Sequence, residues 1–160
     1  MYTAYYHSPV GPLRIRGTEH YISEIHFIDT YPPGAEVHLN PLLQRCQEQL
    51  MEYFQGLRRS FDLPVHQTGS DFQQQVWGEL IGIPFGRTVS YMDIAKRVGD
   101  PKAVRAVGMA NNKNNVVIVV PCHRVIGAKG DLVGYGGGLQ RKTWLLEHEN
   151  RIANGVLTLF

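Results

Sequence analysis

Cysteine and long apolar runs are scarce in this sequence. Its 160 residues include only two cysteines, Cys46 and Cys122, which are too few for a disulfide framework or a cysteine-based zinc knuckle. A reducing compartment is therefore expected. No apolar stretch approaches the roughly 20 residues of a membrane-spanning helix, and the tyrosine-rich N-terminus lacks the pattern of a signal peptide. We expect no membrane partner and a cytoplasmic location, at the nucleoid in a bacterium, or a nuclear one in a eukaryote.

An excess of one charge sign is also absent from the chain as a whole, whose net charge is +2. The distribution is uneven, however. Residues 1–70 carry five Lys or Arg and seven Asp or Glu, whereas residues 71–160 carry eleven and seven. The second half is therefore the better candidate for binding a polyanion, but so small an excess does not identify nucleic acid by itself.

The first half has the pattern of a small sheet followed by a helix. Residues 2–7, 13–16 and 21–28 favour three strands of an antiparallel meander, and residues 30–38 a loop. Asn40-Pro41 is a helix start signal. The helix that follows has an apolar stripe, in which we interpret the cysteine as a core residue: Leu43, Cys46, Leu50, Tyr53 and Leu57. Residues 58–65 are predicted to form a connecting strand, and residues 66–70 a linker.

The second half begins with helical patterns. Ser70 or Asp71 can cap a first helix, and Ser90 begins a capping-box pattern for a second helix that Gly99 ends. Asp100-Pro101 is expected to start a third helix at once, and so tight a connection predicts a helix-turn-helix. Small residues on this third helix would allow close approach to another surface, and basic ones would suit phosphates. A tightly packed helix pair with solvated cations remains the alternative.

Residues 111–115 are rich in asparagine and are predicted to form a tight loop. The five β-branched residues 116–120 predict a short strand buried on both faces, which Pro121 ends. Cys122 follows, and cationic neighbours would favour its thiolate. An inert, buried cysteine is an equally good interpretation of this stretch alone. Residues 126–138 are predicted to form a glycine-rich loop, which either allows close approach to a ligand or is simply a flexible connection. Residues 139–149 are predicted to form a last helix, on which Glu149 is placed to meet His123.

Several motifs in residues 70–149 together resemble the O6-alkylguanine-DNA alkyltransferases, also called methylated-DNA–protein-cysteine methyltransferases. Pro121-Cys122-His123-Arg124-Val125 is similar to the active-site signature of that family, and residues 101–108 resemble its recognition helix. Further matches occur in the same order and spacing at residues 72–77, 84–86, 90–91, 134–139 and 142–149. The first half resembles the family's variable N-terminal domain only in style.

The resemblance implies a direct reversal of DNA damage. Cys122 would accept the alkyl group from the O6 atom of guanine, and from O4-alkylthymine as well, in an irreversible, single-turnover reaction. His123 would act as the base through a bridging water, and Glu149 would orient it. Tyr91 would swing out the phosphate and protonate the leaving guanine, and Asn114 would fix the loop before the cysteine.

The resemblance also implies a set of residues that bind the DNA substrate. Arg105 would take the place of the flipped nucleotide, on a recognition helix that also presents Lys102, Ala103 and Gly108 and that enters the minor groove in the family. The residues alone do not decide between the minor and the major groove. A second group would line or support the guanine pocket: the Cys122 carbonyl, Val125, Tyr135, Gly137 and Lys142.

The expected fold is α+β, with an N-terminal, ribonuclease H-like domain over residues 1–66 and a mostly helical domain over 71–160 that carries the helix-turn-helix and the active-site strand. The partner is double-stranded DNA containing O6-alkylguanine, bound by a monomer without a cofactor. Zinc-binding relatives use N-terminal Cys and His, whereas this half has only Cys46, so we predict no metal. Asn115 stands where many relatives have proline, and Val117 stands where animal relatives have another. These differences leave the tolerance of bulky alkyl groups undecided. A non-catalytic DNA-binding module and a cysteine hydrolase are the competing functions.

Overall fold

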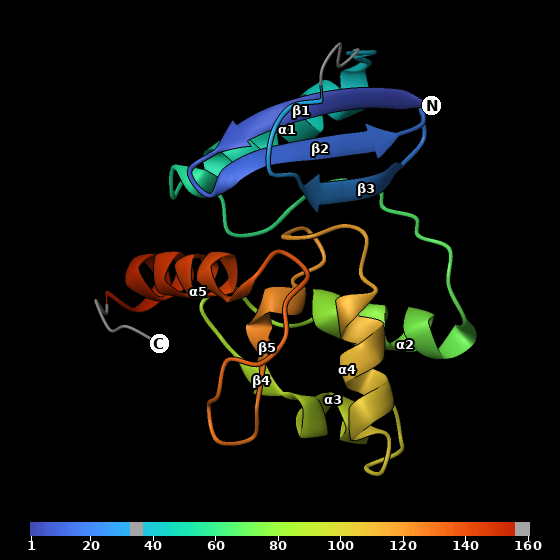
Figure 1. Cartoon of the computed structure of the whole chain (residues 1–160), viewed down its shortest axis with the longest axis vertical. Coiled ribbons are helices and arrows are strands. Elements are labelled where there is room, and N and C mark those ends of the chain that lie inside the picture. The colour runs from blue at the N-terminus through green and yellow to red at the C-terminus, as the bar shows by residue number, and fades with distance from the viewer. Residues whose placement is uncertain (33–36, 156–160) are drawn as a thin grey trace. The chain divides into compact units, whose positions relative to one another are not determined.

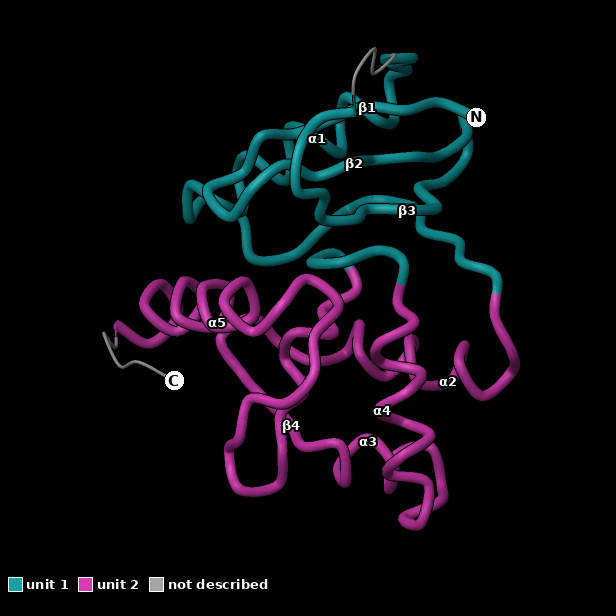
Figure 2. Tube along the Cα trace, in the orientation of Figure 1, with its two compact units in different colours: residues 1–68, 115–119 teal, residues 69–114, 120–160 magenta. Residues whose placement is uncertain are grey.

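The computed structural model describes residues 1–32 and 37–155, and its elements form two compact units (Figures 1 and 2). The first unit comprises residues 1–68 and 115–119, and the second comprises residues 69–114 and 120–160. The chain thus returns to the first unit at residues 115–119, just before Cys122. The predicted domains, residues 1–66 and 71–160, do not include this return. That these parts fold as separate domains remains a prediction. None of the described helices is long and apolar enough to cross a membrane.

The first unit confirms the predicted three-stranded antiparallel sheet. Strands β1 (Tyr2–Ser8), β2 (Gly11–Gly17) and β3 (Ile22–Phe27) follow one another in space as in sequence. Helix α1 (Pro41–Phe54) packs on one face of the sheet, and the side chain of Asn40 caps it at the nitrogen of Leu43. Apolar side chains from both layers are fully buried in the core between them: Ala4, Leu13, Ile15, Ile25, Leu43, Cys46, Leu50 and Tyr53.

The end of the first half differs from the predicted pattern. Helix α1 ends at Phe54, so Leu57 lies outside it and is 74% exposed. The predicted loop at 30–38 includes residues 33–36, which lie outside the described residues. Residues 58–65 do not form a strand, and only Val65 makes an isolated bridge, to Ile22.

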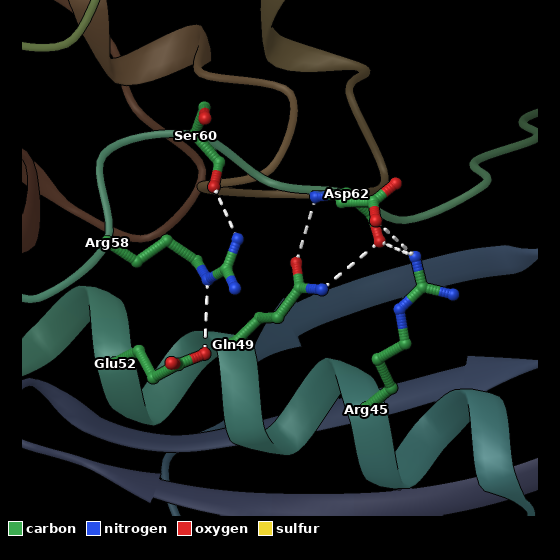
Figure 3. Close-up of polar contacts among 6 residues, drawn as sticks. All are labelled: Arg45, Gln49, Glu52, Arg58, Ser60 and Asp62. Atoms are coloured by element: carbon green, nitrogen blue, oxygen red, sulfur yellow. Dashed lines mark hydrogen bonds and ion pairs between the residues drawn. The ribbon is translucent and has the colours of Figure 1, made fainter.

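Side chains of α1 hold residues 58–62 in place of the predicted connecting strand (Figure 3). The amide of buried Gln49 accepts a hydrogen bond from the backbone nitrogen of Asp62 at 2.9 Å and donates one to its carbonyl at 3.1 Å. Arg45 pairs with the Asp62 carboxylate at 3.0 Å. Arg58 donates to Glu52 at 3.2 Å and to the carbonyl of Ser60 at 3.0 Å. The backbone groups of Asp62 and the carbonyl of Ser60 are thus satisfied without a ladder, which is why the β-pattern misleads here.

The second unit contains four α-helices in its described part: α2 (Asp71–Ile81), α3 (Tyr91–Arg97), α4 (Val104–Asn112) and α5 (Leu139–Asn154). Capping boxes at Ser70 and Ser90 begin α2 and α3, and Gly99 has the positive φ expected after α3. Helix α4 packs against α2 and α3. A two-stranded parallel sheet pairs β4 (Val89–Ser90) with β5 (Val125–Ile126).

Three helix boundaries in this unit were predicted wrongly. Helix α4 begins three residues after Pro101, because Asp100 accepts the amide of Lys102 at 3.0 Å in a turn of its own. Lys102 and Ala103 therefore precede the helix. At the other end Asn111 and Asn112 continue α4 instead of forming a loop. Helix α5 also runs on to Asn154, five residues beyond the predicted Glu149, before Gly155 ends it in the left-handed region.

Residues 116–120 are not a strand, although four of the five are buried. Val116 makes one bridge, to Ile25, and the chain then turns tightly, with the amide of Val119 bonded to the carbonyl of Val117 at 2.8 Å. Ile118 in this turn has φ 73°, a conformation that is strained for a β-branched residue. The β-branched pattern reports burial at this position, not extended backbone.

Candidate active site around Cys122

A single 3₁₀ turn, η1 (Cys122–Arg124), carries the central residues of the site. Pro121 precedes it, and the amide of Cys122 donates to the carbonyl of Val120 at 2.8 Å. The strand that the sequence predicts before Cys122 is therefore absent, and the two-residue strand β5 follows instead. Because β5 pairs with β4, directly before α3, this pairing ties the Cys122 turn to the start of the helix that carries Tyr91. Cys122 is only 5% exposed.

His123 and Arg124 both bond to Glu149 of α5. The Nε2 atom of His123 lies 2.7 Å from Oε2 of Glu149. Arg124 donates from Nε to Oε1 at 2.7 Å and from Nη2 to Oε2 at 3.0 Å, and its Nη1 donates to the carbonyl of Ile83 at 2.7 Å. All three side chains are buried. The sequence indicated the His123–Glu149 pair from the face of the last helix, but not the arginine that shares the carboxylate.

These contacts determine the charge of each partner. Burial alone would raise the pKa of Glu149, but His123 and Arg124 outweigh it and hold that pKa well below its usual range. Burial lowers the pKa of His123, against the opposing effect of Glu149. A neutral imidazole that donates from Nε2 to a carboxylate has its lone pair on Nδ1. The Nδ1 atom of His123 is buried and has no hydrogen-bond partner among the described residues.

The thiol of Cys122 is protonated at neutral pH, because burial raises its pKa to about 11, although a hydrogen bond from Asn114 and the charge of Lys142 oppose this rise. The charge of Lys142 favours the thiolate, as expected of a cationic neighbour, but it does not bring the pKa of Cys122 down to neutral pH. The guanidinium of Arg124 is neutralised by Glu149, and the loss of hydration at Cys122 outweighs the charge of Lys142. A base is needed to ionise this thiol.

Two asparagines hold the backbone around Cys122. Asn114 donates from Nδ2 to the carbonyl of Val120 at 2.8 Å, in addition to its bond with the thiol. Asn111, in the last turn of α4, donates to the carbonyl of Cys122 at 3.3 Å. Sequence reasoning assigned Asn111 to a loop and missed this contact. Its spacing of four from Val107 is a signal that could have placed it on the buried face of the helix.

Lys142 and Tyr91 hold the glycine-rich loop. Lys142 is fully buried and donates from Nζ to the carbonyls of Val125 at 2.7 Å, Val133 at 3.0 Å and Gly134 at 3.3 Å. Burial lowers its pKa to about 8. Tyr91 donates its hydroxyl to the same Val133 carbonyl at 3.0 Å, and burial together with Cys122 raises its pKa.

The remaining predicted site residues fall into two groups. Tyr135 lies in the loop with its hydroxyl oxygen buried, and burial raises its pKa well above the usual value, whereas Gly137, in the same loop, is only half-buried. Arg105 and Lys102 are exposed, and Gly108 lies on α4 where a side chain would meet the ring of Tyr91 at 4.0 Å. Within residues 1–32 and 37–155 no group of three or more His, Cys, Asp or Glu side chains could hold a metal ion.

Comparison with known proteins now identifies the family. Residues 71–151 match the profile described as "6-O-methylguanine DNA methyltransferase, DNA binding domain", and residues 1–67 match its "ribonuclease-like domain". The chain belongs to the 6-O-methylguanine DNA methyltransferase family. The first-half resemblance, which the sequence supported only in style, is thereby confirmed, as is the ribonuclease-like character of the sheet domain.

Curated and solved relatives cover almost the whole chain. A methylated-DNA–protein-cysteine methyltransferase of Mycobacterium tuberculosis is 46% identical over 157 residues, which are 96% of this chain and 94% of the relative. One from Methanosarcina acetivorans is 43% identical over 153 residues, which are 93% of this chain and 98% of the relative. The crystal structure of M. tuberculosis OGT in complex with DNA aligns with a TM-score of 0.84 at 42% identity, over 92% of this chain and 93% of that one.

Proposed function

We propose that this methyltransferase-family chain repairs O6-alkylguanine in double-stranded DNA by transferring the alkyl group to the Sγ atom of Cys122. The observation that carries the proposal is the arrangement at η1: a buried, protonated thiol lies one residue before a neutral histidine whose Nδ1 has no partner in the described protein. Membership of the family supplies the reaction class. Burial keeps this thiol away from competing water until the base ionises it.

The first step is removal of the thiol proton. A thiol with a pKa of about 11 is ionised to only about one part in 10⁴ at pH 7, so His123 takes its proton through a bridging water at Nδ1. A bridging water is needed because the Nδ1 atom of His123 makes no hydrogen bond with the thiol. Glu149 stabilises the imidazolium that forms, while Arg124 fixes both carboxylate oxygens. Glu149 and Arg124 therefore position the base and do not touch the substrate.

The second step is the transfer itself. The thiolate attacks the alkyl carbon in line with the bond to O6, a sulfur–carbon bond forms, and the carbon–oxygen bond breaks with its electrons passing to guanine. Tyr91 donates a proton to a ring nitrogen of the leaving base. Its hydroxyl donates to the carbonyl of Val133, so it exchanges that carbonyl for the base during the transfer. The thioether product has no easy route back to a thiol, and the protein is consumed.

The loop and its supports form the guanine pocket. Lys142 fixes the carbonyls at both ends of the loop segment that begins at Val125, and Asn114 fixes the chain before Cys122. The backbone of Cys122 and Val125 and an amide near Gly137 then read the guanine edge, with Tyr135 as a pocket wall. This arrangement also accommodates O4-alkylthymine, which presents an alkylated oxygen at a similar place.

Helix α4 and the turn before it face the DNA. Arg105 is exposed and takes the place of the extruded nucleotide, while Lys102 and the backbone near Ala103 contact phosphates and Gly108 leaves room beside Tyr91. Extrusion costs a few kcal/mol, less for a poorly paired alkylated base. We also propose that the protein acts as a monomer. We place it in the cytoplasm, at the chromosome, because its Mycobacterium and Methanosarcina relatives come from cells without a nucleus.

A direct test is to incubate the protein with a duplex containing one O6-methylguanine and to weigh the peptide that bears Cys122. The proposal predicts a methyl adduct on that peptide, and a Cys122→Ser variant that still binds the duplex without removing the methyl group. Binding without an adduct would identify a non-catalytic DNA module instead. Turnover of a thioester or ester substrate, again without an adduct, would identify a hydrolase.

A further inference from the structure

The solvent-facing side of α4 combines charge with an exposed apolar side chain. Met109 is 68% exposed, more than any other large hydrophobic residue in the described part of the second unit. It lies four residues after Arg105 and three before Asn112, so these side chains share one face of the helix. Arg105, Asn112 and Lys113 are also exposed. The apolar surface of a methionine that faces water gains no free energy of burial, whereas a partner that covered it would supply that free energy.

The opposite side of α4 fixes this face in place. The indole of Trp77 donates to the carbonyl of Ala110 at 2.9 Å, and Asn111 donates to the carbonyl of Cys122 at 3.3 Å. Gly108 faces the ring of Tyr91. The helix therefore cannot rotate to bury Met109 without breaking its link to the Cys122 turn. Met109 is held at the edge of the site, next to the residue that faces Tyr91.

We propose that Met109 is an apolar wedge that enters the minor groove of DNA beside the nucleotide that Arg105 displaces. This inference rests on the proposed function. Proteins that bend DNA from the minor groove insert methionine, leucine or similar side chains between base steps, and pair them with Arg, Lys and Asn on the same surface. The row of Arg105, Met109, Asn112 and Lys113 has this composition.

The task of the protein also favours the minor groove. A repair protein must act on a lesion in any sequence, and the major groove presents a distinct pattern for each base pair, whereas the minor-groove pattern is degenerate. Partial unstacking by Met109 would lower the cost of extruding the neighbouring base, because a nucleotide at a disturbed step has lost part of its stacking. The wedge would thus assist base flipping and make no contact with the alkyl group.

The test compares single-turnover transfer from O6-methylguanine in a duplex with transfer from the same strand alone. Met109→Gln keeps the unbranched shape and removes the apolar character, while Met109→Leu keeps the apolar character. The ratio of the duplex rate to the single-strand rate should fall about tenfold for Met109→Gln, about 1.4 kcal/mol, and remain near wild type for Met109→Leu. Ile81→Gln, at a position 61% exposed on α2, is the matched control and should leave the ratio unchanged.

Each outcome decides the question. A wild-type ratio in Met109→Gln overturns the wedge, and so does an equal loss on both substrates, which would indicate a structural role of the side chain. A loss in Ile81→Gln as large as in Met109→Gln also overturns it, since any polar substitution would then suffice. If the wild-type protein transfers no methyl group from either substrate, the proposed function fails, which is distinguishable from failure of the wedge alone.

Discussion

Replacing His123 with glutamine separates the base from the rest of the site. Glutamine keeps an N–H that can donate to Glu149, as Nε2 of His123 does at 2.7 Å, but it has no basic nitrogen in place of Nδ1. With a thiol pKa of about 11, the variant must rely on the roughly 10⁻⁴ fraction of thiolate present at pH 7. Because general base catalysis contributes about 10²- to 10⁴-fold, we expect a loss of that size at pH 7.

The pH profile gives the sharper result. Burial lowers the pKa of His123, so the wild-type histidine is neutral throughout the range from pH 7 to 9 and the single-turnover rate should be nearly flat. In His123→Gln the rate should rise about tenfold per pH unit, because it follows the thiolate fraction. His148→Gln, which removes a buried histidine on α5 instead, should keep the wild-type profile. A flat profile at the wild-type rate in His123→Gln would refute the role of His123 as base.

Three further predictions concern stability. Glu149→Gln should lower the free energy of unfolding at pH 7 by about 3–5 kcal/mol, since it leaves Arg124 buried without its charge partner. The pKa of Glu149 is depressed in the folded protein, so its contribution to the free energy of unfolding is present at neutral pH. That contribution is lost on acidification below the usual glutamate pKa, about 4.3. Urea titrations should therefore show that acidification lowers the stability of the variant less than that of the wild type. Gln49→Ala should cost about 1–3 kcal/mol by removing both bonds to Asp62, whereas exposed Gln44→Ala should cost little. Dialysis against a chelator should leave the melting temperature unchanged, and a lowered one would reveal a structural metal.

Local sequence signals predicted the elements that depend on local chemistry. Asn40, Ser70 and Ser90 begin helices where their side chains can accept backbone amides, and alternation marked the three strands. Such caps and patterns depend on residues within one turn or strand. The pairing of Glu149 with His123 was also within reach, because a carboxylate on a buried helical face needs a partner.

The predictions failed where distant groups decide the backbone conformation. The β-branched run at 116–120 is buried as expected, but one bridge to Ile25 and a tight turn replace the strand. In the same way the side chain of Gln49 bonds to the backbone of Asp62 in place of a neighbouring strand. No pattern within the sequence reveals that Arg124 pairs with Glu149, or that burial outweighs the charge of Lys142 at the thiol of Cys122.

Single use of Cys122 as the acceptor is the core of the proposed reaction. Its most direct test is to titrate a fixed amount of protein with a growing excess of O6-methylguanine duplex and to count the methyl groups removed from DNA. We expect a plateau at one methyl group per chain, matched by a methyl adduct on the Cys122 peptide. Removal that continues beyond one equivalent, or a plateau with the adduct on another residue, would contradict it.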